Sequence, residues 1–142
     1  MKYINFFFII FSSVLFSQNE IDTQLINKTK LQVGDIVKID NFENLIYINN
    51  NSIITNRATG ILRYSNVQLG EITSANAFNP LKVNLFYRDF NTVVVLDNRL
   101  SEISKINFNT TKPYRIISHI STGNDNTIWC FNQNTQELEL FN

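Results

Sequence analysis

The sequence predicts an all-β fold assembled from repeated antiparallel sheets. The run Thr92–Leu96 is β-branched and apolar with no polar position, which indicates a strand buried on both faces. Asp97 and Asn98 follow it, a dipeptide type that supplies the positive φ angles of a tight hairpin turn. The chain holds 22 Asn but only 4 Gly and 2 Pro, so we expect Asn, which tolerates left-handed backbone, to make many of the turns.

The first 17 residues are typical of a secretory signal peptide. Lys2 supplies a basic start, Ile4–Phe16 is almost wholly apolar, and small serines precede polar Gln18. A run of about 13 residues is too short to span a bilayer, which needs about 20. We therefore expect cleavage between Ser17 and Gln18 and export to the periplasm or the medium; a retained N-terminal anchor is the alternative.

Charge and cysteine content narrow the partners and the source of stability. Lys plus Arg equals Asp plus Glu at 12 each, so no net field attracts nucleic acid or an anionic membrane. Cys130 is the single cysteine, so an exported chain cannot close a disulfide within itself. We expect Cys130 to be a small buried residue and stability to come from packing.

After a linker or edge segment at 18–32, residues 33–142 read as a succession of short strands. Runs rich in β-formers, bounded by Asn, Asp, Gly or Pro, predict them. The predicted strands cover 31–40, 44–48, 52–55, 60–64, 67–73, 82–88, 92–96, 115–121, 127–131 and 137–141.

The segment after the Asp97-Asn98 turn is ambiguous. Leu96, Leu100 and Ile103 have the i, i+4, i+7 spacing of a helix, which a bulged strand also permits. The turn signal and the return to alternation at 106–108 favour a strand, the second limb of a hairpin.

Three segments resemble one another, which points to a repeat. Residues 42–49, 90–97 and 125–132 align as a polar start, four apolar residues and a closing Asn or Asp. The closing residues lie 48 and then 35 positions apart, a range that overlaps the blade period of about 40 to 50 residues in β-propellers. In a propeller each four-stranded sheet is covered by its neighbours, so inner strands become continuous apolar runs and outer strands alternate.

Residues 79–103 and 126–142, behind a Phe-rich leader ending in FSQ, resemble the exported β-propeller proteins of unknown function in flavobacteria. The resemblance covers nearly the whole mature chain and implies a scaffold, with no catalytic residues to transfer. About three blades cannot close a ring that needs about four to eight. The expectation is an incomplete ring, either the N-terminal part of a longer propeller or a ring completed by self-association through open edges.

Few residues suggest chemistry. His119 is the sole histidine, which disfavours zinc, and a triad of Ser118 or Ser121 with His119 and Asp125 lacks a nucleophile motif. Asn124–Asn126 lacks the spacing of a calcium loop. Asp89 and Asp97 lie roughly 25 Å apart along an extended run, too far to act on one glycosidic bond. No metal, cofactor or catalytic residue is predicted.

Tyr87, Arg88 and Asp89 are the best candidates for recognition, because an aromatic beside an Arg in a strand connection can stack or fork onto a ligand. A surface pair of Arg88 and Asp89 with Tyr87 in the core is the structural alternative. The sequence thus predicts an exported, non-enzymatic binding or scaffold module of the cell envelope with a protein or glycan partner. The rival is a fragment of a propeller-type polysaccharide lyase or glycoside hydrolase.

Overall fold

A computed structural model describes residues 22–142 of the chain. The predicted signal peptide and its cleavage site between Ser17 and Gln18 lie outside these residues. The chain divides into two units, 1–31 and 32–142, and residues 22–31 of the first carry no helix or strand. Within the described residues, no helix has the length and apolar content needed to cross a bilayer.

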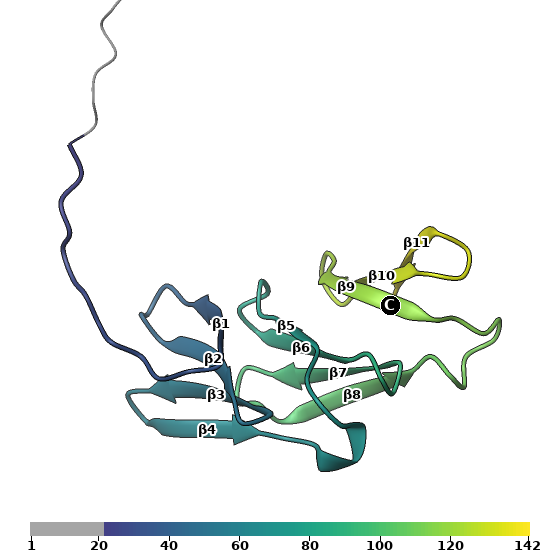
Figure 1. Cartoon of the computed structure of the whole chain (residues 1–142), viewed down its shortest axis with the longest axis horizontal. Coiled ribbons are helices and arrows are strands. Elements are labelled where there is room, and N and C mark those ends of the chain that lie inside the picture. The colour runs from purple at the N-terminus through teal and green to yellow at the C-terminus, as the bar shows by residue number, and fades with distance from the viewer. Residues whose placement is uncertain (1–21) are drawn as a thin grey trace, which may run out of the picture. The chain divides into compact units, whose positions relative to one another are not determined.

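The second unit is all-β, as predicted, and forms three antiparallel sheets (Figure 1). The first sheet contains, in order, β1 (Asp35–Ile39), β2 (Leu45–Asn49), β3 (Ser52–Arg57) and β4 (Gly60–Tyr64). The second contains β5 (Ser74–Asn76), β6 (Lys82–Tyr87), β7 (Thr92–Asp97) and β8 (Glu102–Asn107). The third contains β9 (Ile117–Thr122), β10 (Ile128–Asn132) and β11 (Glu137–Phe141).

Most predicted strands are present, with two corrections. The segment predicted as a strand at 67–73 instead forms a 3₁₀ turn at Val67–Leu69, because the Asn66 side chain accepts a hydrogen bond from the Gln68 amide and caps it. The third sheet contains three described strands rather than four. The segment after Asp97, where helical spacing was the alternative, is a strand, β8, as predicted.

The hairpin between β7 and β8 forms where expected, but its turn differs from the prediction. Leu100, not the Asp97-Asn98 pair, has the positive φ, at 60°. Asp97 instead accepts hydrogen bonds at Oδ1 from the backbone amides of Arg99 and Ser101, both at 2.8 Å. The aspartate therefore stabilises the turn through its side chain rather than through its backbone conformation.

The sequence repeat is real at the level of sheets, but its alignment is shifted by one strand in the second sheet. Residues 45–49 and 128–132 are second strands, whereas 92–97 is a third strand. The first strands of the three sheets begin at residues 35, 74 and 117, which are 39 and 43 positions apart. The aligned segments are unevenly spaced, by 48 and then 35 residues, because two of them are second strands and one is a third strand. Second and third strands are both interior and equally apolar, so their sequences align.

A turn residue repeats at the entrance to each third strand. Asn51, Asn91 and Gln136 directly precede β3, β7 and β11, and all three have positive φ. The Asn51 side chain donates to the Gly70 carbonyl and accepts from the Ile72 amide, both at 2.7 Å. Each of the first two sheets thus uses an Asn at this turn to hold the chain that leads to the next sheet.

Asn91 makes the same pair of contacts one sheet later. Its Nδ2 donates to the Arg115 carbonyl at 2.6 Å, and its Oδ1 accepts from the Ile117 amide at 2.9 Å. The Asn91 side chain is buried, and its bond to the Ile117 amide is buried too, so this bond satisfies a backbone donor that water does not reach. The bonds position the first residue of β9 against the second sheet.

The second sheet is covered on both faces. Alternate residues of β6 and β7 pack toward the first sheet in one core, formed by Ile46, Ile53, Ala77, Val83, Leu85, Tyr87, Val94, Leu96 and Leu100. The opposite residues pack toward the third sheet in another, formed by Phe86, Val93, Val95, Phe108, Ile117, Ile128 and Cys130. The uninterrupted apolar run of β7 is therefore explained by two covered faces.

Cys130 lies in the core between the second and third sheets, as predicted. Burial raises the pKa of its thiol to about 12. The thiol therefore stays protonated near neutral pH and has no nucleophilic character.

Candidate functional site

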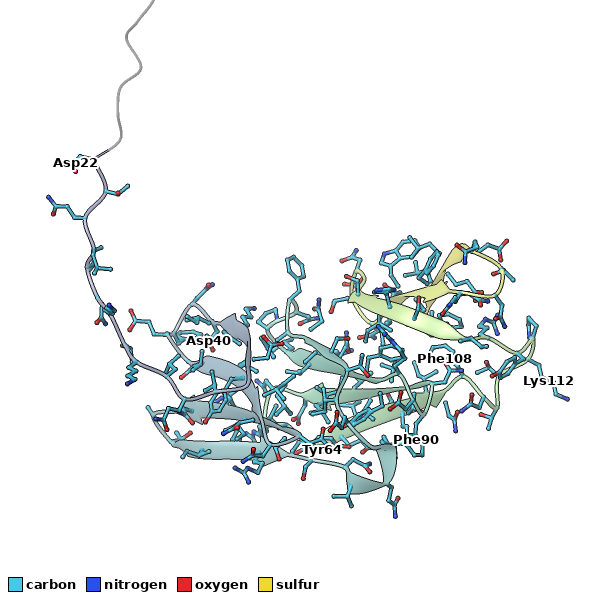
Figure 2. All side chains as sticks on the ribbon, in the orientation of Figure 1. Asp22, Asp40, Tyr64, Phe90, Phe108 and Lys112 are labelled. Carbon is cyan, nitrogen blue, oxygen red and sulfur yellow. The ribbon has the colours of Figure 1, made fainter. Side chains whose placement is uncertain are left out.

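The structure separates the three residues predicted for recognition. Tyr87 is fully buried between the first and second sheets, and burial raises the pKa of its phenol. Arg88 and Asp89 are exposed in the turn between β6 and β7, next to Phe90 (Figure 2). The Arg88 guanidinium donates to the Ser118 carbonyl at 3.0 Å. The Tyr87 ring is thus packed in the core and does not share a surface with Arg88.

The residues considered for catalysis do not converge. The Ser118 hydroxyl and His119 Nδ1 lie 3.0 Å apart, but they are sequence neighbours on an edge strand. Asp125 lies in the turn before β10, and no hydrogen bond joins it to His119 in the part of the chain that is described. Residues 22–142 contain no group of three His, Cys, Asp or Glu side chains placed to hold a metal ion.

A cavity between the first and second sheets is the strongest candidate site. Its volume is about 180 Å³. Three strand connections, at 40–44, 79–80 and 98–100, supply its rim together with the end of β3, and the core between the two sheets supplies its floor. It is lined by Lys38, Asp40, Asn41, Phe42, Asn44, Ile46, Thr55, Arg57, Ala77, Asn79, Pro80, Val83, Asn98 and Leu100.

Two polar atoms in the cavity wall are buried without a partner. The Thr55 hydroxyl and the Arg57 Nε have no hydrogen bond to any described residue, although Thr55 is only 1% exposed. The Arg57 Nη2 donates to the Asn98 carbonyl, which ties the guanidinium to the second sheet. Leaving a buried donor unpaired costs free energy, so these atoms are unexplained by packing alone.

The charges at the cavity are unbalanced. Lys38 and Arg57 are cationic, and Asp40 is the one carboxylate in the lining. Asp40 lies at the turn that joins β1 to β2 (Figure 2) and accepts from the Phe42 amide at 2.8 Å and from the Asn44 amide at 2.9 Å. The Asn44 side chain also donates to it at 2.8 Å and, with these amides, holds the pKa of Asp40 below its ordinary value.

The hydrogen bonds of Asp40 lie within its own turn, although the charge of Arg57 also helps to lower the Asp40 pKa, so one carboxylate faces two cations. Lys38 Nζ has one hydrogen bond, to the Phe78 carbonyl at 3.3 Å. Neither Lys38 nor Arg57 forms an ion pair with a carboxylate in the described part of the chain. The cavity therefore presents an excess of donors and of positive charge.

An aromatic residue stands at the rim. Phe42 is 85% exposed, which is unusual for a phenylalanine with a core beside it. No sequence pattern identifies these residues as one site, because Phe42, Thr55 and Asn98 come from separate turns and strands. The dense polar turn at 40–44, closed by an exposed Phe, is the one signal that could have found the site.

No family model, curated protein or solved structure matches this chain. The site is therefore interpreted from its own geometry.

Proposed function

We propose that the chain is an exported, non-enzymatic binding module of the cell envelope, built as part of a β-propeller, and that it binds a glycan at the cavity between its first two sheets. The observation that carries this proposal is the cavity itself, where buried Thr55 and Arg57 atoms without partners meet an exposed aromatic rim. Ligand sites commonly combine an apolar floor with a few convergent polar groups.

The propeller assignment is supported by the arrangement of the sheets. Their first strands recur every 39 and 43 residues, and each sheet packs on the next through an apolar core. The side chains of neighbouring sheets also meet near their first strands, since Thr122 of β9 donates to Asn76 of β5 at 2.6 Å. These features suit successive blades around a common axis.

The binding proposal is tested with a panel of immobilised envelope saccharides and the mature chain that begins at Gln18. We expect retention on a subset of the panel and no turnover of any member. Cleavage of a saccharide would instead support the rival function, a fragment of a lyase or glycoside hydrolase. Absence of binding to every saccharide would refute the glycan role.

The ends of the sheet stack suggest a second role, self-association. The face of the third sheet that points away from the second presents Trp129, Phe131, Leu138 and Leu140 in register. The corresponding outer face of the first sheet presents Ile36, Ile39, Tyr47 and Ile61, with the buried Ile54 between them. Contiguous apolar faces of this kind are rare on monomers and mark interaction surfaces.

We propose that a second copy of the chain covers both faces. Packing the first sheet of each copy on the third sheet of the other repeats the sheet-on-sheet contact already made twice within the chain. Two such contacts related by a two-fold axis close a ring of six sheets, within the usual range of about four to eight.

Light scattering during size-exclusion chromatography tests the ring. We expect the mass of two copies for the mature chain and the mass of one copy for Leu138→Lys combined with Leu140→Lys. The matched control is Lys105→Glu combined with Ser104→Lys on β8, which leaves both end faces unchanged. A wild-type chain that stays a well-behaved monomer at high concentration would refute closure by a second copy.

A further inference from the structure

We propose that the cavity between the first and second sheets selects a carboxylate-bearing sugar, a uronate unit of an acidic glycan, through Arg57, Lys38 and Thr55. This inference rests on the proposed function of glycan binding and adds the chemical class of the ligand. It starts from the surplus of cationic donors in the cavity wall.

The size of the cavity limits the ligand to about one ring. A volume of about 180 Å³ equals the space of roughly six water molecules at about 30 Å³ each. Such a site accepts the terminal or pendant part of a glycan rather than a long stretch of chain. The remainder of the ligand must extend past the rim, where Phe42 and Pro80 are exposed.

The charge of the cavity favours a carboxylate. The Arg57 guanidinium is fixed at Nη2 by the Asn98 carbonyl, and its Nε has no partner. A planar carboxylate can accept two hydrogen bonds from such a fork, and Lys38 adds a second positive charge. Because Nε is shielded from solvent and Nη2 is bonded to the Asn98 carbonyl, the ligand carboxylate must replace that carbonyl as the Arg57 side chain turns toward it.

The remaining lining suits a sugar better than a peptide carboxyl end. Within residues 22–142 the side-chain amides of Asn41 and Asn98 make no hydrogen bond, and each offers a donor and an acceptor to ring hydroxyls. The exposed Phe42 ring offers an apolar face to the C–H side of a sugar.

Isothermal titration of the mature chain with galacturonate, glucuronate, glucose, acetate and a short peptide with a free carboxyl end tests the inference. We expect binding of at least one uronate, at least tenfold tighter than glucose or acetate, and weaker binding as salt increases. Arg57→Gln is expected to weaken uronate binding at least tenfold, and Arg57→Lys less, because Lys keeps the charge but not the fork.

Lys112→Gln is the matched control. Lys112 is exposed in the connection between β8 and β9, outside both end faces, and does not line the cavity. Circular dichroism and thermal unfolding of each variant separate loss of binding from loss of folding, and Lys38→Gln supplies a second variant should Arg57→Gln fail to fold.

The outcomes show whether the inferred ligand class or the proposed function is wrong. Equal affinity for glucose and the uronates, unchanged by Arg57→Gln, overturns the carboxylate inference while glycan binding stands. Tightest binding to the peptide carboxyl end or to acetate also overturns it. If no saccharide binds in the titration or on the panel, the proposed function itself fails.

Discussion

The second and third sheets share a pattern of apolar interior strands but differ in what covers them. In the second sheet, β7 is buried along nearly its whole length by sheets on either side. In the third sheet, β10 is just as apolar, yet Trp129 and Phe131 lie on a face that no other described element covers. A continuous apolar run therefore indicates that both faces of a strand are suited to burial. This holds even for β10, one face of which no other described element covers.

The largest expected effect is the difference in unfolding free energy between truncating a buried leucine and truncating an exposed one. Leu85 on β6 is 0% exposed between the first and second sheets, whereas Leu138 on β11 is 61% exposed. Leu85→Ala should lower the free energy of unfolding by about 3–5 kcal/mol, since it removes packing and leaves a cavity.

The matched change Leu138→Ala should cost within about 0.5 kcal/mol in dilute solution, where a second copy does not cover the third sheet. Chemical denaturation at low and high protein concentration measures both. If the cost of Leu138→Ala grows with protein concentration, a second copy covers the third sheet at high concentration. Equal costs for the two leucines in dilute solution would contradict the distinction between a buried and an exposed leucine.

The next effect concerns how the second sheet positions the third. Asn91→Ala removes the partner of the Arg115 carbonyl and of the Ile117 amide. Leaving a buried backbone group unpaired costs about 1–3 kcal/mol, and only the Ile117 amide is fully buried whereas the Arg115 carbonyl is part-buried, so we expect a total loss of about 2–3 kcal/mol. Hydrogen exchange should speed up in β9 to β11 more than in β1 to β4, because the contact supports the third sheet.

Asn51→Ala is the counterpart of this change, since Asn51 holds residues 70 and 72 at the entrance to the second sheet. It should speed exchange in β5 instead. Identical exchange patterns for the two variants would show that these asparagines do not act locally on the following sheet.

The same comparison explains which features of the structure can be predicted from the sequence. Period and composition identify nearly all the strands, because a run such as Thr92–Leu96 leaves no other economical conformation. They do not identify a strand's place in its sheet, since second and third strands are equally apolar, and this shifted the repeat alignment. The 3₁₀ turn at 67–69 was missed because Val67 and Leu69 look like strand residues and one Asn66 hydrogen bond decides the outcome.

The cavity was beyond prediction for a different reason. Phe42, Thr55 and Asn98 come together only when the first sheet packs on the second, and no local pattern records that packing. Tyr87 and Arg88, by contrast, are adjacent in sequence but point to different environments, because successive residues of a strand face opposite sides and β6 ends between them.

The smallest expected effect concerns Glu139, whose hydrogen bonds help to stabilise the third sheet, one face of which no described element covers. Burial raises the pKa of Glu139, but hydrogen bonds from Asn132, at 2.8 Å, and from Arg115 outweigh it and lower the pKa below its ordinary value of 4.5. Because the folded-state pKa is depressed, the carboxylate stabilises the fold above about pH 4.5, and this stabilisation is lost as pH falls through the folded-state pKa.

Glu139→Gln should therefore cost about 1–2 kcal/mol at pH 7 and progressively less as the pH falls toward 3, where the wild-type side chain is itself protonated. Urea unfolding between pH 3 and 7 measures the difference between the two chains. Glu137→Gln, two positions away on β11, is the matched control, because Glu137 is exposed and forms no ion pair among the described residues; it should change the free energy of unfolding by less than about 0.5 kcal/mol. A constant difference across this range would mean that Glu139 acts through its shape, and that the third sheet does not rely on a charged anchor.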